Sequence, residues 1–524
     1  MQENTSQWCG TTSVDEAIRT PDRPIALVFR ENGEVTIAQE RFSGANILPP
    51  VYPERMGSRT FKSAHSVRFA YVVGAMARGI TTAEMVVAAQ QAGFLAFFGA
   101  AGLELGAIEI AIDHIQSEVG PGAGGWGSNL IHAPQTPETE RATVDLYLRK
   151  GVRRMSASAF MGLSPEIVRY AAKGMTLSGD STIVRRNHVF AKVSHPHVAT
   201  AFMSPAPADM ARDLVAAGDL TEEEADCITR LPVACDITAE ADSGGHTDNR
   251  PASVLLASLG DTRETVCRRH GLDPATIRIG LAGGIGTPSA VAGAYAMGAD
   301  YVVTGSVNQP TVESGLSEAG REMLLHVAMD DVAMAPAADM FERGVKVQVL
   351  RRGTLFSARA ERLFQLYRAH EALETLNHRD RDFVESCLGE PIDAAWEKTF
   401  DYLKTKRPKD AARVEASPKA RMAFLFRRYL FQCAEWARNG DTAHGAEYQI
   451  WCGPALGAFN RWVAGSPLEP LESRTVRRVG YALLKGAAQV TRAQQLRSAG
   501  VYVPSSLFTP KPLDHDGRGL DAAA

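Results

Sequence analysis

A histidine that follows two glycines is the first candidate for chemistry in this sequence. The stretch AEADSGGHTDNRP, residues 239–251, places His246 directly after Gly244 and Gly245. The two glycines remove side-chain bulk, so the imidazole can lie beside a flat ligand. An imidazole titrates close to neutral pH, where it can donate a hydrogen bond or a proton. We therefore predict that His246 is a catalytic residue.

Two glycine-rich stretches later in the chain predict a phosphate-binding site. Gly283 and Gly284 lie in LAGGIGTPSAV, and Gly305 and Ser306 lie in ADYVVTGSVNQP. Glycine lets backbone N–H groups approach phosphate oxygens closely, and the N-terminus of a following helix adds partial positive charge. Plain tight turns are the alternative use of these glycines. The pairing of two such stretches favours phosphate binding.

Small or polar residues end three earlier apolar runs. Gly74, Ala75 and Met76 end the run FAYVVGAM, where small residues let a planar ring lie against the backbone. Asn129, in GWGSNLIH, and Lys192, in VFAKVS, end two others. An amide can hydrogen-bond the edge of a ring, and an ammonium can stabilise negative charge on it. For each of these residues alone, packing or solvent exposure is the competing interpretation.

The composition excludes several classes of function. The chain has 524 residues, of which 45% are hydrophobic and 22% charged, and its net charge is −4. A nucleic-acid-binding protein usually carries a basic excess, which is lacking here. The N-terminus has no secretory pattern, and no apolar run reaches the roughly 18 residues of a membrane helix. We expect a cytoplasmic protein with neither nucleic-acid nor membrane partners.

The cysteine and histidine spacings predict no metal site. Seven cysteines are scattered without a CxxC pair, which argues against a disulfide framework and favours a reducing compartment. His195 and His197, in SHPHVA, have the spacing of a metal pair. No cysteine or carboxylate at helical spacing accompanies them, so a zinc site is not indicated.

Eight repeats of a short apolar strand and a helical stretch fill residues 66–309. Alternating strands and helices imply a parallel sheet covered by helices, and eight units fit a (β/α)8 TIM barrel. An open doubly wound sheet is the alternative, but its glycine fingerprint comes at the first turn, whereas these glycines come in units seven and eight. All candidate residues follow strands, where a barrel places its active site.

The remaining segments are predicted to surround the barrel. Residues 1–65 form an accessory element, in which PIALVFRENGEVTIAQE predicts a β-hairpin. Residues 195–231 are too long for one barrel helix and predict a lid-like or docking insertion after strand five. The strand signal disappears after Gln309, so residues 310–505 are predicted to be a helical subdomain, and residues 506–524 a flexible tail.

Five motifs together resemble one family: AEADSGGHTDNRP, LAGGIGTPSAV, ADYVVTGSVNQP, DDVAMAPAADMFERGVKVQVLRRGTLF and YQIWCGPALGAFNRWV. They resemble the trans-acting enoyl reductases of bacterial polyunsaturated fatty acid and polyketide synthases, the PfaD family. That family is a branch of the FMN-dependent 2-nitropropane dioxygenase-like barrels. The resemblance runs from about residue 15 to residue 505, and the motifs after the barrel are the most specific because a generic flavin barrel lacks them.

The resemblance implies an enzyme that reduces the α,β double bond of an enoyl thioester. It implies FMN as the cofactor, NADPH as the hydride donor and an acyl carrier protein as the partner that carries the substrate; a homodimer is consistent with it. It matches His246 to the family's active-site histidine. It also matches Gly283, Gly284, Gly305 and Ser306 to the family's phosphate loops, and Asn129 and Lys192 to polar flavin contacts.

Three other functions stay open at this point. A nitronate monooxygenase-like oxidase would use the same barrel and FMN with oxygen as acceptor. An IMP dehydrogenase-like enzyme would need a nucleophilic cysteine on a barrel loop, a place that none of the barrel cysteines convincingly takes. A flavin-free scaffold would only dock onto a synthase. Basic clusters after the barrel are either solvated surfaces or a docking site for an acidic partner. They consist of Arg351, Arg352, Lys404, Lys406, Arg407, Lys409, Arg427 and Arg428.

Overall fold

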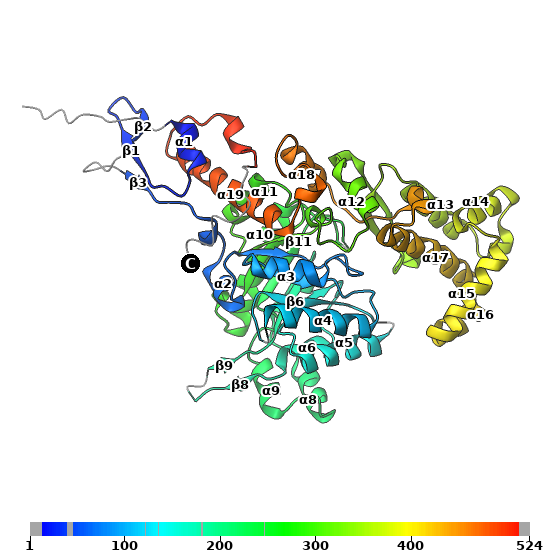
Figure 1. The fold of residues 1–524 in the computed structure, drawn as a ribbon. Coiled ribbons are helices and arrows are strands. Elements are labelled where there is room, and N and C mark those ends of the chain that lie inside the picture. The colour runs from blue at the N-terminus through cyan, green and yellow to red at the C-terminus, as the bar shows by residue number, and fades with distance from the viewer. Residues whose placement is uncertain are drawn as a thin grey trace, which may run out of the picture. The chain divides into compact units, whose positions relative to one another are not determined.

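Eight parallel strands close into a barrel in the computed structural model of the protein (Figure 1). They pair in the order β10-β11-β12-β13-β4-β5-β6-β7, so the sheet closes on itself and the predicted (β/α)8 barrel is confirmed. The strands are almost entirely buried, as expected for parallel strands covered on both faces. They are β4 (Tyr71–Val73), β5 (Leu95–Phe98), β6 (Trp126–Ile131), β7 (Arg154–Ser158), β10 (His188–Val193), β11 (Asp236–Glu240), β12 (Arg278–Ala282) and β13 (Val302–Thr304).

The structure describes residues 13–38, 46–120, 122–134, 136–179, 182–245 and 247–512. They form two compact units. The barrel unit contains the described residues up to Asp242, Asp248–Ser314 and those from Arg461 onward; the helical unit contains Ser243–Thr247 and Gly315–Asn460. Among the described residues, no helix is both long and apolar enough to span a membrane.

Helices from the whole length of the chain cover the barrel. One comes from far along the sequence: α19, which lies within the predicted helical subdomain 310–505, belongs to the barrel unit. It lies very close to α11, because a Cβ at Gly486 would be 2.5 Å from Cγ of Pro288. The helices are α3 (Ala83–Gln91), α4 (Leu105–Val119), α5 (Pro137–Lys150), α6 (Pro165–Ala172), α7 (Pro196–Met203), α8 (Ala208–Ala216), α9 (Glu222–Ile228), α10 (Ala252–His270), α11 (Pro288–Ala296) and α19 (Val476–Ser498).

The N-terminal element packs against α19. Strands β1 (Ile25–Phe29) and β2 (Val35–Ala38) pair antiparallel, which confirms the predicted hairpin, and β3 (Asn46–Leu48) adds a third strand. Helix α1 (Val14–Arg19) precedes them. The guanidinium of Arg492 in α19 is fully buried and donates to three backbone carbonyls of this element, those of Pro21, Arg23 and Pro49.

Helix α2 (Arg59–His65) enters the amino end of the barrel, where the strands begin. Its Phe61 ring stacks on Tyr301 with centroids 4.5 Å apart and meets Phe190 edge-on. All three rings are at most 1% exposed and belong to one hydrophobic core cluster. The amino end is therefore filled by aromatic side chains.

A buried polar cluster completes this seal. Asp236 accepts two hydrogen bonds from Arg278, at 2.6 and 2.8 Å, and lies 3.1 Å from Nε2 of His65. Arg154 donates to Nδ1 of His65. His65, His188 and Asp236 lie within 4.8 Å of one another, as metal ligands can. However, the two guanidiniums already occupy the Asp236 carboxylate and one His65 nitrogen, and their positive charge disfavours a bound cation.

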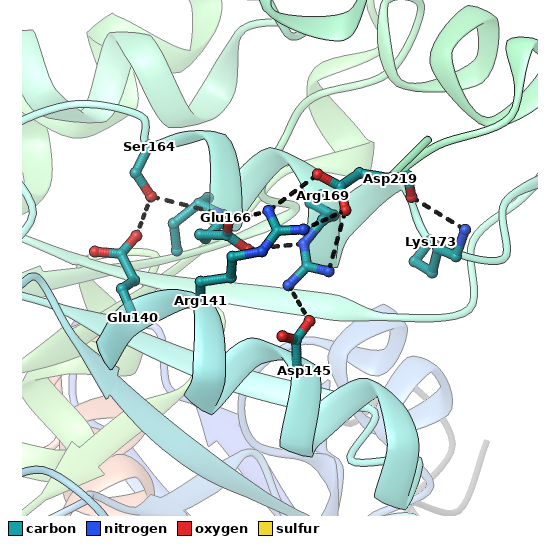
Figure 2. Close-up of polar contacts among 9 residues, drawn as sticks. Glu140, Arg141, Asp145, Ser164, Glu166, Arg169, Lys173 and Asp219 are labelled. Carbon is teal, nitrogen blue, oxygen red and sulfur yellow. Dashed lines mark hydrogen bonds and ion pairs between the residues drawn. The ribbon is translucent and has the colours of Figure 1, made fainter. Parts of the chain in front are cut away.

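The insertion after β10 consists of α7, α8 and α9. Figure 2 shows Asp219, between α8 and α9, receiving hydrogen bonds from Arg141 of α5 at 2.7 and 3.0 Å, with Arg169 and Lys173 beside it. Helix α9 also contacts the hairpin of β8 (Thr176–Leu177) and β9 (Ile183–Val184), which precedes β10 and so lies at the amino end. Helix α9 therefore lies near the amino end, and the lid-like role of residues 195–231 stays a prediction.

The helical unit is built around its own core of buried residues, which includes Phe341, Leu363 and Phe426. It also contains an antiparallel hairpin, β14 (Val332–Pro336) with β15 (Lys346–Leu350), which corrects the expectation that no strand follows Gln309. Its helices are α12 (Glu318–Leu325), α13 (Phe356–Ala369), α14 (His378–Leu388), α15 (Ile392–Lys406), α16 (Pro408–Ala416) and α17 (Pro418–Asn439), and α18 (Ala455–Val463) follows across the unit boundary.

Candidate active site

The predicted residues of the barrel unit meet at its carboxyl end, where the strands finish. Neighbouring strand ends are tied together there by backbone hydrogen bonds. The N–H of Gly74, after β4, donates to Thr304 O of β13 at 2.9 Å, and the N–H of Ala241, after β11, donates to Ala282 O of β12 at 2.9 Å. The loops that carry the candidate residues therefore surround one mouth.

Lys192 and Glu240 point into this mouth from adjacent strands. Side chains two residues apart share one face of a strand, and Phe190 of β10 lies in the barrel core, so Lys192 also points inward. By the same alternation, Glu240 shares a face with Thr238, whose hydroxyl hydrogen-bonds to the buried Tyr301 hydroxyl. Nζ of Lys192 lies 2.6 Å from Oε1 of Glu240, and the two side chains are 18% and 9% exposed.

Asn129 is held in β6 with its amide oriented. Its backbone carbonyl accepts from the Tyr147 hydroxyl at 2.6 Å, and its Oδ1 accepts from the N–H of Ala101, in the loop after β5, at 3.1 Å. Because a backbone N–H can only donate, this contact fixes which amide atom is the oxygen. The side chain is 6% exposed, and its NH2 group is the part that can donate to a ligand.

The loop after β4 is clasped by a buried threonine. The hydroxyl of Thr81 donates to Gly74 O and accepts from the N–H of Met76, both at 2.9 Å, and Thr81 is 0% exposed. A Cβ at Gly74 would lie 3.0 Å from Cγ1 of Val303, so only glycine fits easily there. Ala75 and Met76 follow with partly exposed side chains. The loop is therefore fixed in shape, and Gly74 and Ala75 add little side-chain bulk to it.

The glycines after β12 and β13 form a cradle that suits an anion. Gly283 has φ +90°, and a Cβ there would be 2.7 Å from the carbonyl carbon of Ala241. A Cβ at Gly284 or Gly305 would meet no protein atom within 4 Å, so both backbones face open space. Within the described residues, neither of these two N–H groups donates to a protein acceptor. Ser306, next to Gly305, begins a short 3-10 helix. The geometry fits the phosphate of a cofactor such as FMN.

His246 itself lies outside the described residues. Gly244, two positions before it, packs within the helical unit, where a Cβ would lie 3.3 Å from the backbone of Cys452. This contact links two of the motifs behind the family resemblance, SGGH and YQIWCGP. The neighbouring Ser243 has a buried hydroxyl without a hydrogen-bond partner within the described part of the chain.

Polar residues beside the mouth make local contacts. Asp248 and Asn249 are possible caps of the next helix by sequence, but the N-cap of α10 is Pro251, and no side chain caps it. Asp248 instead accepts a hydrogen bond from Ser194 at 3.2 Å. His195 caps α7 by accepting from the N–H of His197, which gives the SHPH pair a structural role.

Sequence reasoning missed two residues of the mouth. Glu240 ends an apolar strand just as Lys192 does, so the rule that singled out Lys192 also applies to Glu240. Thr81 carries no comparable signal, because its role depends on two hydrogen bonds to a loop that precedes it in the chain.

Most of the basic residues after the barrel are engaged within the protein. Arg427 pairs with Glu342, and Arg428 with Glu390. Arg351 donates to a backbone carbonyl, and Arg352, Lys404 and Arg407 each pair with a nearby aspartate. In contrast, Lys406 and Lys409 are exposed, and no acidic partner is found for them in the part of the chain that the structure describes. These two lysines remain available to an acidic partner.

Known proteins resemble this chain over most of its length. Among solved structures, the enoyl reductase domain of MlnA, from the macrolactin biosynthesis cluster of Bacillus amyloliquefaciens, is 36% identical with a TM-score of 0.81, and the match covers 85% of this chain and 99% of that one. A family model described as the inserted helical domain of [acyl-carrier-protein] S-malonyltransferase matches residues 370–448.

Two curated relatives are longer than this chain. One of the subunits of the polyunsaturated fatty acid synthase of Thraustochytrium sp. is 39% identical over 462 residues, which are 87% of this chain and 31% of that protein. Polyketide biosynthesis protein PksE of Bacillus subtilis is 37% identical over 497 residues, which are 94% of this chain and 63% of that protein. The chain therefore spans less than two thirds of the length of either relative.

Proposed function

Because the chain belongs to the family of enoyl reductases found in polyketide and polyunsaturated fatty acid synthases, we propose that it reduces the α,β double bond of enoyl thioesters. One observation carries the proposal: the 36% identity that extends over 99% of a solved enoyl reductase domain. The barrel mouth supports it, because fixed small groups, an open glycine cradle and inward polar groups suit a planar cofactor with a phosphate.

We propose FMN as the cofactor and NADPH as the reductant. When bound, FMN would take a hydride from NADPH and deliver it to the β-carbon of the thioester, while a proton adds to the α-carbon. The open N–H groups of Gly284 and Gly305 would bind the phosphate, with Gly283 and Ser306 shaping the same loops. The fixed loop from Gly74 to Met76 would support the ring.

The remaining residues would bind and orient the reacting groups. The NH2 of Asn129, which donates to no acceptor among the described residues, would donate a hydrogen bond to the edge of the ring. Lys192 would place positive charge beside it. His246 would either polarise the thioester carbonyl, where negative charge develops in the transition state, or supply the proton to the α-carbon. Supplying the proton requires the protonated imidazole, whereas an N–H of the neutral imidazole is enough to polarise the carbonyl.

We further propose that the thioester is carried by an acyl carrier protein. The relatives include a fatty acid synthase component and a polyketide biosynthesis protein, and residues 370–448 match a helical domain of an enzyme named for its carrier-protein substrate. That segment contains Lys406 and Lys409, two exposed cations without an acidic partner among the described residues. An acidic carrier protein would find complementary charge there.

The test is an anaerobic absorbance titration of the purified protein. NADPH is expected to bleach the flavin bands, and an enoyl thioester on a carrier protein is expected to restore them. Bands restored only by air would replace the proposal with a nitronate monooxygenase-like oxidase. A protein that shows no flavin bands even after FMN is added would be a scaffold and not a redox enzyme.

A further inference from the structure

The ion pair between Lys192 and Glu240, at the partly exposed mouth of the barrel, affects the proposed reaction. The two side chains come from neighbouring strands, and the hydrogen-bond register places Lys192 opposite Thr238, two residues before Glu240. This stagger lets the long lysine side chain reach forward to the carboxylate at the strand end, giving an Nζ to Oε1 distance of 2.6 Å. The pair is thus built by the barrel itself.

Glu240 is needed to hold Lys192 in this position. An unpaired ammonium on a side chain that is only 18% exposed would lose much of its hydration, whereas a carboxylate at contact distance compensates for that loss. Lysine also has a long, flexible side chain, and one strong partner restricts it. Without the carboxylate, the ammonium would be drawn toward a ligand in the mouth that gains negative charge.

Glu240 also offsets the charge that Lys192 presents to a ligand. A lone ammonium in the mouth would favour any group that gains negative charge, and a carboxylate 2.6 Å away reduces that effect. A flavin gains electrons on reduction, so nearby positive charge favours its reduced form and nearby negative charge favours its oxidised form. The mouth therefore presents a balanced pair instead of a full positive charge.

We propose that Glu240 is a positioning residue that holds Lys192 beside the flavin and sets how readily that flavin is reduced. This inference rests on the proposed function, because it requires FMN in the mouth. It predicts opposite effects for the two members of the pair. Removing the carboxylate makes the flavin easier to reduce, and removing the ammonium makes it harder to reduce.

The experiment measures the midpoint potential of the FMN-loaded full-length protein by equilibration with a reference dye. Glu240→Gln is expected to raise the reduction equilibrium constant at least about tenfold, which is about 30 mV for a two-electron couple. Lys192→Met is expected to lower it by a similar factor. Glu240→Asp keeps the charge and is expected to stay close to the wild-type potential. Glu264→Gln removes an exposed carboxylate that pairs with Arg263, and serves as the matched control with no shift.

Two results would overturn the inference: potentials that move in the same direction in both single variants, or potentials that do not move in either. Should Glu240→Gln fail to fold, the Lys192→Met/Glu240→Gln double variant takes its place. Having lost both charges, it is expected to lie near wild type, while Lys192→Met alone lies lower. The proposed function fails separately, since a wild-type protein that binds no FMN would already have failed the anaerobic titration.

Discussion

The two ends of the barrel use the same kinds of residue in opposite ways. Strands β10 and β11 each contribute a polar residue to both ends: His188 and Asp236 at the amino end, Lys192 and Glu240 at the carboxyl end. At the amino end, helix α2 closes the barrel, and Asp236 is fully buried among guanidinium and imidazole partners. At the carboxyl end, the ion pair lies beside glycine loops that face open space. The two ends differ in closure and not in residue type, and this difference separates the stabilising cluster from the candidate binding site.

The largest expected effect follows from breaking the closed end. Asp236→Asn leaves the Arg278 guanidinium, which is 8% exposed, without its counter-charge. We expect a loss of about 3 to 5 kcal/mol in the free energy of unfolding, the range for one partner removed from a buried pair. Urea unfolding followed by circular dichroism measures it. Glu240→Gln at the open end is the matched variant and should lose clearly less, because water reaches the mouth; equal losses would contradict the contrast between the two ends.

The closed end should also make the protein sensitive to acid. Burial lowers the pKa of His65, and it lowers the pKa of His188 to about 3. Between that value and the usual histidine pKa of about 6.5, the unfolded chain takes up protons that the folded protein does not. Stability is therefore full above neutral pH and falls as the pH drops below about 6.5; for His188 the loss at pH 4.5 is about 2 to 3 kcal/mol.

Unfolding midpoints at pH 7.5 and pH 4.5 measure this dependence, and His188→Gln supplies the comparison. The variant lacks one of the two titrating groups, so its midpoint should change less between the two pH values. A variant as acid-sensitive as the wild type would mean that His188 does not contribute.

The smallest expected effect on stability comes from adding a single methyl group, by replacing glycine with alanine, at the open end. Gly305→Ala at the open end meets no protein atom and has φ −129°, so we expect a change within about 0.5 kcal/mol in stability. The same change should weaken FMN binding at least about tenfold, because the methyl group occupies the phosphate cradle. Gly127→Ala does the reverse: its Cβ would lie 2.3 Å from Arg154 O, so it should destabilise the fold by about 1 to 3 kcal/mol.

Flavin fluorescence titration gives the FMN dissociation constant, and thermal unfolding without added FMN gives the stability. The two variants test the contrast between the two ends directly. Gly305→Ala should change the FMN dissociation constant but not the stability, and Gly127→Ala should change the stability but not the FMN dissociation constant. If Gly305→Ala binds FMN as tightly as the wild type, the cradle does not hold the phosphate.

The barrel was predictable from sequence because each strand is a short buried run with its own boundaries. The position of α19 on the barrel was not predictable, because its amphipathic pattern shows that one face is buried but does not show which element covers that face. The answer lies in close contacts with residues far away in the chain, such as Gly480 against Phe94 and Gly486 against Pro288. The hairpin β14–β15 was not predicted because β14, VAMAP, is rich in alanine and ends in a proline, and both residues are uncommon in strands.

The candidate site was predictable residue by residue but not as an arrangement. The end of a strand singles out Lys192 and Asn129, but the partners of each follow only from the register between strands and from the loops beside them. The Glu240 carboxylate, the Ala101 N–H and the Thr81 hydroxyl are partners of this kind. A single sequence does not show which atoms of neighbouring strands and loops contact each other.

The contact between α19 and the N-terminal element has a consequence for how the chain is made. Arg492 binds the carbonyl of Pro21, 471 positions earlier in the chain. At 5 to 20 residues per second, a ribosome needs roughly 25 to 95 seconds to travel that distance. Throughout that time, the apolar faces of Ile25 and Leu27 lack the helix that covers them. The N-terminal element thus leaves the ribosome long before the helix against which it packs is made, and its apolar surface is exposed to aggregation during that interval.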